Sequence, residues 1–228
     1  MKAEKRTRTL TLFQLIYDAQ DEAFAQLVEQ KTNTTLAALI RSLGFGGTLK
    51  DEGCQVLICG SAEDFIQATG KRAEDYEEWM VGNTDPVGRR ICLLSPRVTT
   101  RTMEDMGKVF VHEAVHMIFD LRMGPGEHPL WCEEGIALLL AEQTDLNYVD
   151  EKACPRIAKL SNGESFADRG GYDYAGVYVG YFIKKHGFEK FLALYNHSAE
   201  AEALLDLSFE ADAVRWAKEQ GGVKAFVD

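Results

Sequence analysis

The stretch between Thr102 and Gly124 constrains the fold more than any other, because both of its ends carry helix signals. Thr102 is a favourable N-cap residue, and Asp105 follows three positions later, as in a capping box. At the other end, Gly124-Pro125-Gly126 is a strong helix stop. The sequence therefore predicts a helix from Thr102 to about Leu121.

Two apolar runs upstream of this helix predict buried strands. Gln55–Cys59 lies between glycines, and Arg89–Ser95 is followed by a proline. Between the two runs, Ser61 is a candidate N-cap for a short helix that Gly70 would end. Downstream, the spacing of apolar residues predicts helices over 130–142, 172–186, 188–195 and 200–220.

The first fifty residues are predicted to form a helical layer. Apolar side chains between residues 11 and 31 recur at three- and four-residue spacings, which predicts an amphipathic helix. The Thr32–Thr35 cluster interrupts this helix, and a second short helix follows it. We therefore expect a helical layer over residues 1–50 and the main domain over residues 51–228, joined in one compact unit. Helices, then strands, then helices favour an α+β fold over alternating βαβ units.

Composition limits the classes of partner. The 228-residue chain has 25 Lys and Arg against 36 Asp and Glu, a formal net charge of −11. Such a surface repels phosphate backbones and anionic lipids, so we expect neither a nucleic-acid nor a membrane partner. The five cysteines are an odd number without dense spacing, which favours free thiols in a reducing compartment. With no signal-peptide pattern, the expected location is cytoplasmic.

The predicted helix after Thr102 contains the motif His112-Glu113-Ala114-Val115-His116. Residues four apart lie one above the other on a helix, so both imidazoles can face one metal ion. Glu113 is rotated by about 100° around the helix axis, where it can take a proton from a zinc-bound water. The alternative is two histidines that make ordinary hydrogen bonds on a half-buried helix.

A possible third ligand stands in the next predicted helix, which begins with Trp131-Cys132-Glu133-Glu134-Gly135-Ile136-Ala137. This segment offers a carboxylate 18 positions after His116. A helix–turn–helix of this length can bring one carboxylate to the paired histidines. The result would be a His₂Glu site with an open fourth position, as catalytic zinc sites have.

Together, the two motifs resemble the gluzincin metallopeptidases of the MA clan, and most closely their small peptidase MA-like domains. The likeness covers about residues 54–195 and includes Val56–Ile58, Ser61–Phe65, Gly88–Leu94 and the tyrosine-bearing segment Tyr174–Gly187. It implies a zincin-like fold: a small mixed sheet with an antiparallel edge strand, an HExxH helix, a glutamate helix and a helical C-terminal part. It also implies that the strand at Arg89–Ser95 is the substrate-facing edge, which pairs with an extended peptide.

Carried onto this chain, the family pattern makes His112, His116 and Glu134 the ligands of one Zn²⁺ per chain. Glu113 becomes the general base. Glu134 is preferred because it precedes the Gly-x-Ala of the family motif, whereas Glu133 points about 100° away around the helix. Glu133 is kept as the fallback ligand.

Family members also use a tyrosine hydroxyl to stabilise the oxyanion. Here the candidates are Tyr174, then Tyr172, and last Tyr178. For each of them, packing in the core or on the surface is an equally good interpretation.

The resemblance implies a zinc-dependent metallopeptidase that hydrolyses a peptide or protein substrate through a zinc-bound water activated by Glu113. An aminopeptidase is not expected, because the Gly-x-Met-Glu-Asn segment of that group is missing. The thermolysin-like Glu-x-x-x-Asp pattern is missing as well, since Leu138 stands four residues after Glu134. Two alternatives stay open: a zinc-binding pseudo-peptidase that acts as an interaction or regulatory module, and a helical scaffold with a fortuitous motif. The sequence leaves the oligomeric state open.

Overall fold

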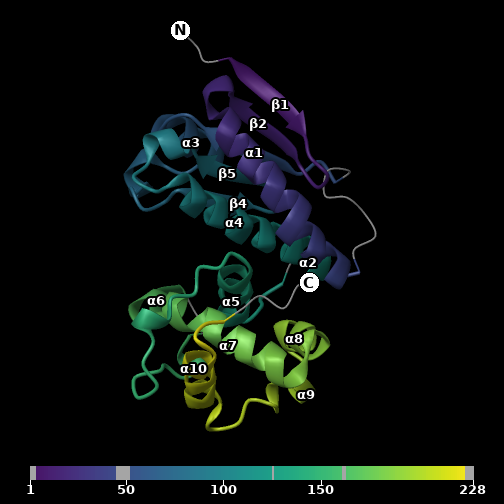
Figure 1. The fold of residues 1–228 in the computed structure, drawn as a ribbon, viewed down its shortest axis with the longest axis vertical. Helices are drawn as coiled ribbons and strands as arrows, with labels where there is room; N and C mark the ends of the chain where they lie inside the picture. Colours follow the sequence, from purple (N-terminus) through teal and green to yellow (C-terminus); the bar gives the residue numbers. More distant parts are fainter. Residues whose placement is uncertain (1–3, 45–51, 125, 161–162, 224–228) are drawn as a thin grey trace. The chain divides into compact units, whose positions relative to one another are not determined.

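The computed structural model describes residues 4–44, 52–124, 126–160 and 163–223. These residues form two compact units that divide after Gly124 (Figure 1). The first unit contains a five-stranded sheet and helices α1 to α4, and the second unit is helical. The predicted α+β class is confirmed, but the domain boundary expected near residue 50 does not coincide with this division.

The sheet of the first unit is mixed, with the strand order β1-β2-β3-β5-β4. Its three inner strands β2, β3 and β5 run parallel to one another, and both edge strands are antiparallel to their neighbours. The expected small mixed sheet with an antiparallel edge strand is therefore present. The strands are β1 (Lys5–Thr9), β2 (Gln14–Asp18), β3 (Gln55–Cys59), β4 (Gly82–Asp85) and β5 (Arg90–Leu94).

The central strands follow the sequence signals closely. β3 and β5 coincide with the two predicted strands, and every residue from Ile91 to Leu94 is buried. A strand buried on both faces needs cover on both sides, and β5 contacts the helices α3 (Ala62–Thr69) and α4 (Met103–Met123). Helix α3 is capped as predicted: Ser61 accepts a hydrogen bond from the Asp64 amide, and Gly70 ends the helix with a φ of 68°.

Helix α4 confirms the strongest expectation from the sequence. Thr102 and Asp105 form a reciprocal capping box, and the helix ends at Gly124. Its buried side packs against β4, β5 and α1 (Glu22–Lys31). The rings of Phe110 on α4 and Phe13 meet edge to face, with centroids 6.2 Å apart. These contacts fix the rotation of α4 about its own axis.

The helix predicted over residues 11–31 is wrong in its first half. Residues 14–18 form β2, which pairs with β1 on one side and β3 on the other. Leu15 and Tyr17 are buried, which is the alternation of a strand. The apolar residues Leu12, Leu15, Ile16 and Ala19 also stand at helical spacings, so the pairing with other strands decided the conformation. The expected layer over residues 1–50 thus includes two strands.

The predicted interruption at Thr32–Thr35 is confirmed in part, because α1 ends at Lys31 and a second short helix follows, although the backbone between them stays helical. The backbone continues from α1 through a π-helical turn, η2 (Thr32–Leu36), into α2 (Ala37–Ser42). The hydroxyl of Thr32 donates to the carbonyl oxygen of Val28 at 2.8 Å, so this side chain supports the helix instead of ending it.

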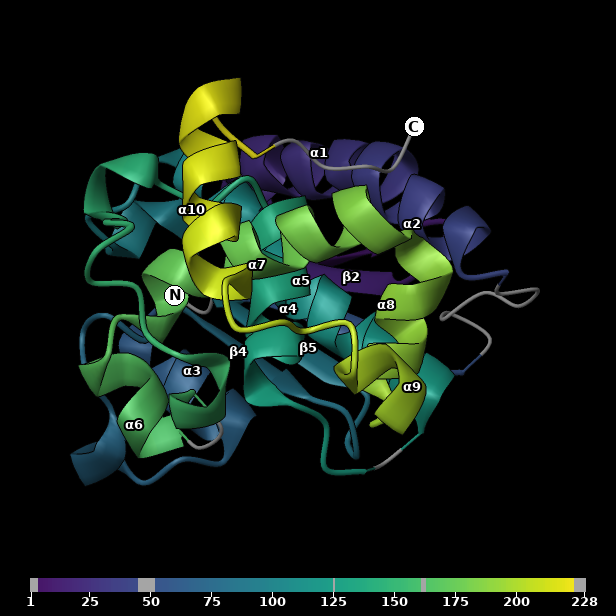
Figure 2. The same cartoon turned by 90° about the horizontal axis from the view of Figure 1, so that it is seen from below.

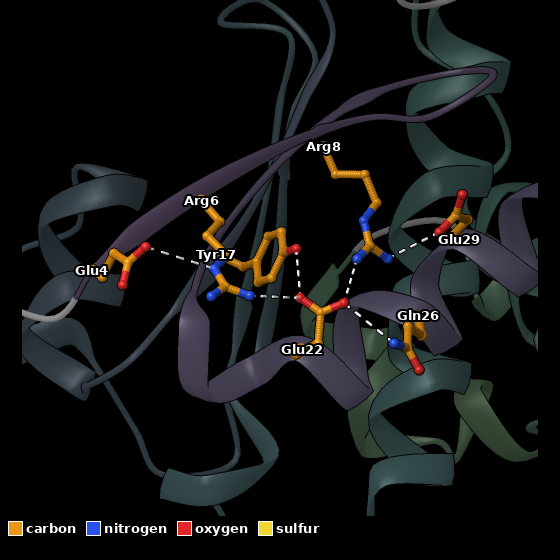
Figure 3. Close-up of polar contacts among 7 residues, drawn as sticks. All are labelled: Glu4, Arg6, Arg8, Tyr17, Glu22, Gln26 and Glu29. Atoms are coloured by element: carbon orange, nitrogen blue, oxygen red, sulfur yellow. Dashed lines mark hydrogen bonds and ion pairs between the residues drawn. The ribbon is translucent and has the colours of Figure 1, made fainter.

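A polar network joins the edge strand β1 to α1 (Figure 3). The carboxylate of Glu22 accepts hydrogen bonds from the hydroxyl of Tyr17 and from the guanidinium of Arg8, and Arg8 also bonds Glu29 at 2.9 Å. These donors lower the pKa of Glu22 to about 2. The charges on β1 are thus paired within the unit, which protects the exposed edge from adding a further strand.

The second unit is built around α7 (Gly171–His186), which contacts α5, α6, α8 and α10. Its other helices are α5 (Leu130–Leu140), α6 (Gly163–Asp168), α8 (Phe188–Tyr195), α9 (Ala199–Glu202) and α10 (Phe209–Gln220). The predictions for α5, α7 and α8 hold to within two residues at their ends, whereas the helix expected over 200–220 is broken between α9 and α10. Within the described residues, no helix combines the length and apolar character that a membrane span requires.

Short 3₁₀ turns complete both units. They are η1 (Ala19–Asp21), η3 (Ala73–Asp75), η4 (Pro96–Val98), η5 (Leu146–Tyr148) and η6 (Ile157–Lys159).

Candidate metal centre

Helix α4 presents His112 and His116 as a pair. Both side chains are half-buried, and the residues between them on the core side, Ala114 and Val115, are buried completely. The Nε2 atoms of the two histidines lie 3.0 Å apart, and their rings meet at 73° with centroids separated by 4.7 Å. The four-residue spacing on α4 therefore places the two imidazole nitrogens close together.

This geometry fits a metal ion. Zinc–nitrogen bonds are about 2.0–2.1 Å long, so one ion can contact two nitrogens that are this close. His112 and His116 on α4 offer two imidazole nitrogens, and Glu134 on α5 offers a carboxylate oxygen, and all three are donor atoms of the kinds that zinc prefers. Three protein ligands would leave the fourth position open.

The side chain between the histidines in sequence, Glu113, is held by strand β4. The Thr84 hydroxyl lies 2.7 Å from Glu113 Oε2 and 2.8 Å from the Glu113 carbonyl oxygen, and it can donate to one of them at a time. Gly82 approaches from the same strand, where a Cβ atom would come within 2.8 Å of Glu113 Oε1. The same Cβ would come within 2.6 Å of Val109 Cγ1, so a glycine at position 82 leaves room for both side chains of α4.

Strand β4 also corrects the predicted substrate-facing edge. The strand predicted at Arg89–Ser95 corresponds to β5, which has β3 on one side and β4 on the other. The edge strand beside α4 is β4, whose residues Gly82, Asn83 and Thr84 are half-buried. The sequence analysis missed β4 because Gly-Asn-Thr-Asp has no apolar pattern.

One local signal could have revealed this strand. Asp85-Pro86-Val87-Gly88 has the residues that a type I turn favours, and the Gly88 amide donates to Asp85 Oδ1 at 2.9 Å. A turn directly before a predicted strand indicates a hairpin, and hence a second strand upstream.

Glu134 belongs to the second unit, on α5. The following residue, Gly135, lies against α7: a Cβ atom on it would come within 2.5 Å of the Ala175 carbonyl oxygen and of Val179 Cγ2. Only glycine permits this approach, so the Glu-Gly pair fixes the rotation of α5 against α7. Both Glu133 and Glu134 are half-buried.

The three candidate tyrosines lie on α7 and differ in what their hydroxyls do. The Tyr174 hydroxyl accepts a hydrogen bond from the Asp150 amide at 2.9 Å and lies 3.3 Å from the carbonyl oxygen of the same residue. The Tyr178 hydroxyl donates to the Pro155 carbonyl at 2.8 Å, and burial raises the pKa of Tyr178. Tyr172 is 51% exposed. Two of these hydroxyls thus hold the loop that contains residues 150–155.

Comparison of the sequence with protein-family models and with curated proteins finds no match.

Proposed function

We propose that this protein is a zinc-dependent metallopeptidase of the gluzincin type. His112 and His116 hold the ion from α4, and Glu134 on α5 is the third ligand. The observation that carries the proposal is the 3.0 Å approach of the two histidine Nε2 atoms. Glu113 lies on the same helix, and the Thr84 hydroxyl of β4 contacts its carboxylate. Glu113 occupies the position that a general base requires in this motif.

The chemistry divides between the metal and the chain. When bound in such a site, zinc would supply an acidified water and Lewis-acid polarisation of a carbonyl. The Glu113 carboxylate accepts the proton of the attacking water and delivers it to the leaving amine. The Thr84 hydroxyl holds that carboxylate in place. Tyr174 and Tyr172 stay the candidates for the hydrogen bond to the oxyanion.

The free edge of β4 is the proposed place for the substrate backbone. An extended peptide can add to an edge strand through main-chain hydrogen bonds. β4 is an edge of the sheet, and its Thr84 contacts Glu113, so a peptide on this edge would lie beside the general base. This arrangement favours a peptide bond as the group that is hydrolysed.

The alternative, a zinc-binding pseudo-peptidase, shares the metal site but needs no general base. The hydrogen bond from Thr84 serves Glu113 and not the histidines. This support for Glu113 favours an active enzyme over an interaction module.

Metal analysis tests the ligand set. We expect about one zinc per wild-type chain by elemental mass spectrometry, and loss of that zinc in Glu134→Ala, because a site with two ligands binds zinc far more weakly. Glu133→Ala is the matched control, since it removes a carboxylate one position away, and it should keep the metal. A wild-type chain without zinc after reconstitution would refute the proposal. Loss in Glu133→Ala alone would assign the site to Glu133.

Thr84 variants test how Glu113 is positioned. Thr84→Val keeps the shape of the side chain but removes the hydroxyl, and we expect kcat to fall about tenfold with zinc content unchanged. Thr84→Ser restores the donor and should recover most of the activity. An unchanged kcat in Thr84→Val would show that this hydrogen bond does not position the carboxylate.

A further inference from the structure

A cavity of about 1070 Å³ opens within the second unit. Its walls come from the start of α5, from η6, from the end of α8 and from the segment that joins α9 to α10. Figure 2 shows that joining segment as the yellow-green loop between α9 and α10. The volume is slightly above the range of about 300–1,000 Å³ that is usual for ligand pockets.

One part of the cavity wall is apolar. Leu130, Ile157, Leu194 and Leu205 contribute aliphatic side chains, and Trp131 contributes an aromatic one. An apolar wall gives affinity for hydrocarbon but little selectivity. Selectivity therefore has to come from the polar groups.

The polar groups of the cavity are mainly acidic. Five lining residues carry a carboxylate: Glu127, Glu133, Glu202, Asp206 and Glu210. Arg156 is the lining residue with a permanent positive charge, so five negative charges and one positive charge leave a balance of −4 with neutral histidines. The cavity thus holds a large share of the formal net charge of −11 of the whole chain.

Arg156 is already engaged. Its Nη1 atom lies 2.8 Å from Glu210 Oε2 and donates to the Leu207 carbonyl at 2.6 Å, and the other oxygen of Glu210 accepts the Ile157 amide at 3.1 Å. This pair, in which only Glu210 is buried, is a structural element of the wall. The other four lining carboxylates are Glu127, Glu133, Glu202 and Asp206, and Asp206 lies 3.5 Å from Nζ of Lys185, a residue outside the lining.

Two of these four carboxylates, Glu202 and Asp206, lie at the end of α9 and in the segment that joins α9 to α10. Hydrogen bonds from Ser208 lower the pKa of Asp206, which therefore carries its negative charge at neutral pH. Glu202 is 3.4 Å from Nδ1 of His197, whose Nε2 atom bonds the Glu127 carbonyl oxygen at 2.8 Å. The rim thus presents fixed negative charge next to the apolar wall.

We propose that this cavity binds a lysine or arginine side chain of a peptide, together with an apolar neighbour. A cation on an aliphatic stem satisfies both parts of the wall, because the stem packs on leucine while the charge meets the carboxylates. Glu133 lines the cavity and directly precedes Glu134 on α5. The inference rests on the proposed function in one respect: it assigns basic peptides as the substrate class of the peptidase.

The test is a binding measurement with matched probes. The probe is a fluorescein-labelled, end-blocked peptide of alternating leucine and lysine, and its match has glutamine in place of lysine. The protein carries Glu113→Gln, so that the probe stays intact. We expect the lysine probe to bind about tenfold more tightly by fluorescence anisotropy and to lose that advantage as salt is added. Equal affinity for both probes would overturn the proposal.

Removal of negative charge from the rim of the cavity tests whether the lysine probe binds there. Glu127 and Glu202 are exposed, so replacing both by glutamine removes two charges without disturbing the core. We expect this double variant to bind the lysine probe about tenfold more weakly. Glu200→Gln is the control, because Glu200 is also exposed and pairs with Lys190 outside the cavity. Equal weakening in the control would place the effect in general surface charge and refute the cavity.

The two proposals fail separately. Lysine-selective binding in a chain that holds no zinc would refute the peptidase and leave the cavity as a binding site for basic peptides. Zinc and peptidase activity without any preference for basic peptides would refute the cavity alone.

Discussion

Glu113→Gln is expected to lower kcat/KM for peptide hydrolysis by about 10²–10⁴-fold, the usual contribution of a general base. Glutamine keeps the length of the side chain and an oxygen that can accept the Thr84 hydroxyl, so the local structure should persist. It cannot accept the proton of the attacking water. Cleavage of a library of quenched fluorescent peptides measures this loss.

The control for Glu113→Gln is a second replacement of glutamate by glutamine on helix α4. Glu104 lies in the first turn of α4, has a side chain 59% exposed, and pairs with Lys31. Glu104→Gln should leave both activity and zinc content unchanged. Zinc content should also be unchanged in Glu113→Gln, because Glu113 is not among the proposed ligands. Full activity in Glu113→Gln would show that another group accepts the proton.

Gly135→Ala is expected to destabilise the second unit by about 1–3 kcal/mol, the usual cost of overpacking a core. Helix propensity alone predicts the opposite sign, since alanine is favoured over glycine in a helix by about 1 kcal/mol. The close contact decides: the added Cβ would lie 2.5 Å from the Ala175 carbonyl oxygen, a backbone atom that cannot move without shifting α7.

Urea unfolding followed by tryptophan fluorescence measures the effect, because the buried Trp131 lies on the same helix as Gly135. Gly163→Ala is the matched control. Gly163 begins α6, and a Cβ on it would meet no atom within 4 Å, so this variant should be neutral or slightly more stable. A Gly135→Ala protein as stable as the wild type would show that α5 and α7 do not need their close approach.

Local signals predicted a large part of the fold. The caps at Ser61 and Thr102 and the stops at Gly70 and Gly124 act over three or four residues, and each of them begins or ends a helix where expected. The strands β3 and β5 were predicted because their apolar runs are buried whatever their neighbours are. The pairing of His112 and His116 also needs no partner far away in the sequence, because it follows from helical spacing alone.

Other features depended on partners far away in the sequence. Residues 14–18 carry a spacing that suits a helix, but β1 and β3 pair with them and make them a strand. β4 has no apolar pattern and becomes a strand through its pairing with β5. A prediction from short segments cannot include such pairings.

The sequence by itself determined the chemistry that the chain can offer: two histidines at helical spacing, a glutamate between them, and the caps that make this segment a helix. Only the tertiary structure decided that β4 is the edge beside Glu113, that Thr84 holds this carboxylate, and that acidic side chains from residues 127 to 210 line one cavity. The physical reason is the distance along the sequence over which each interaction acts. Helix signals act within four residues, whereas strand pairing and side-chain packing join residues whose separation along the chain carries no local pattern.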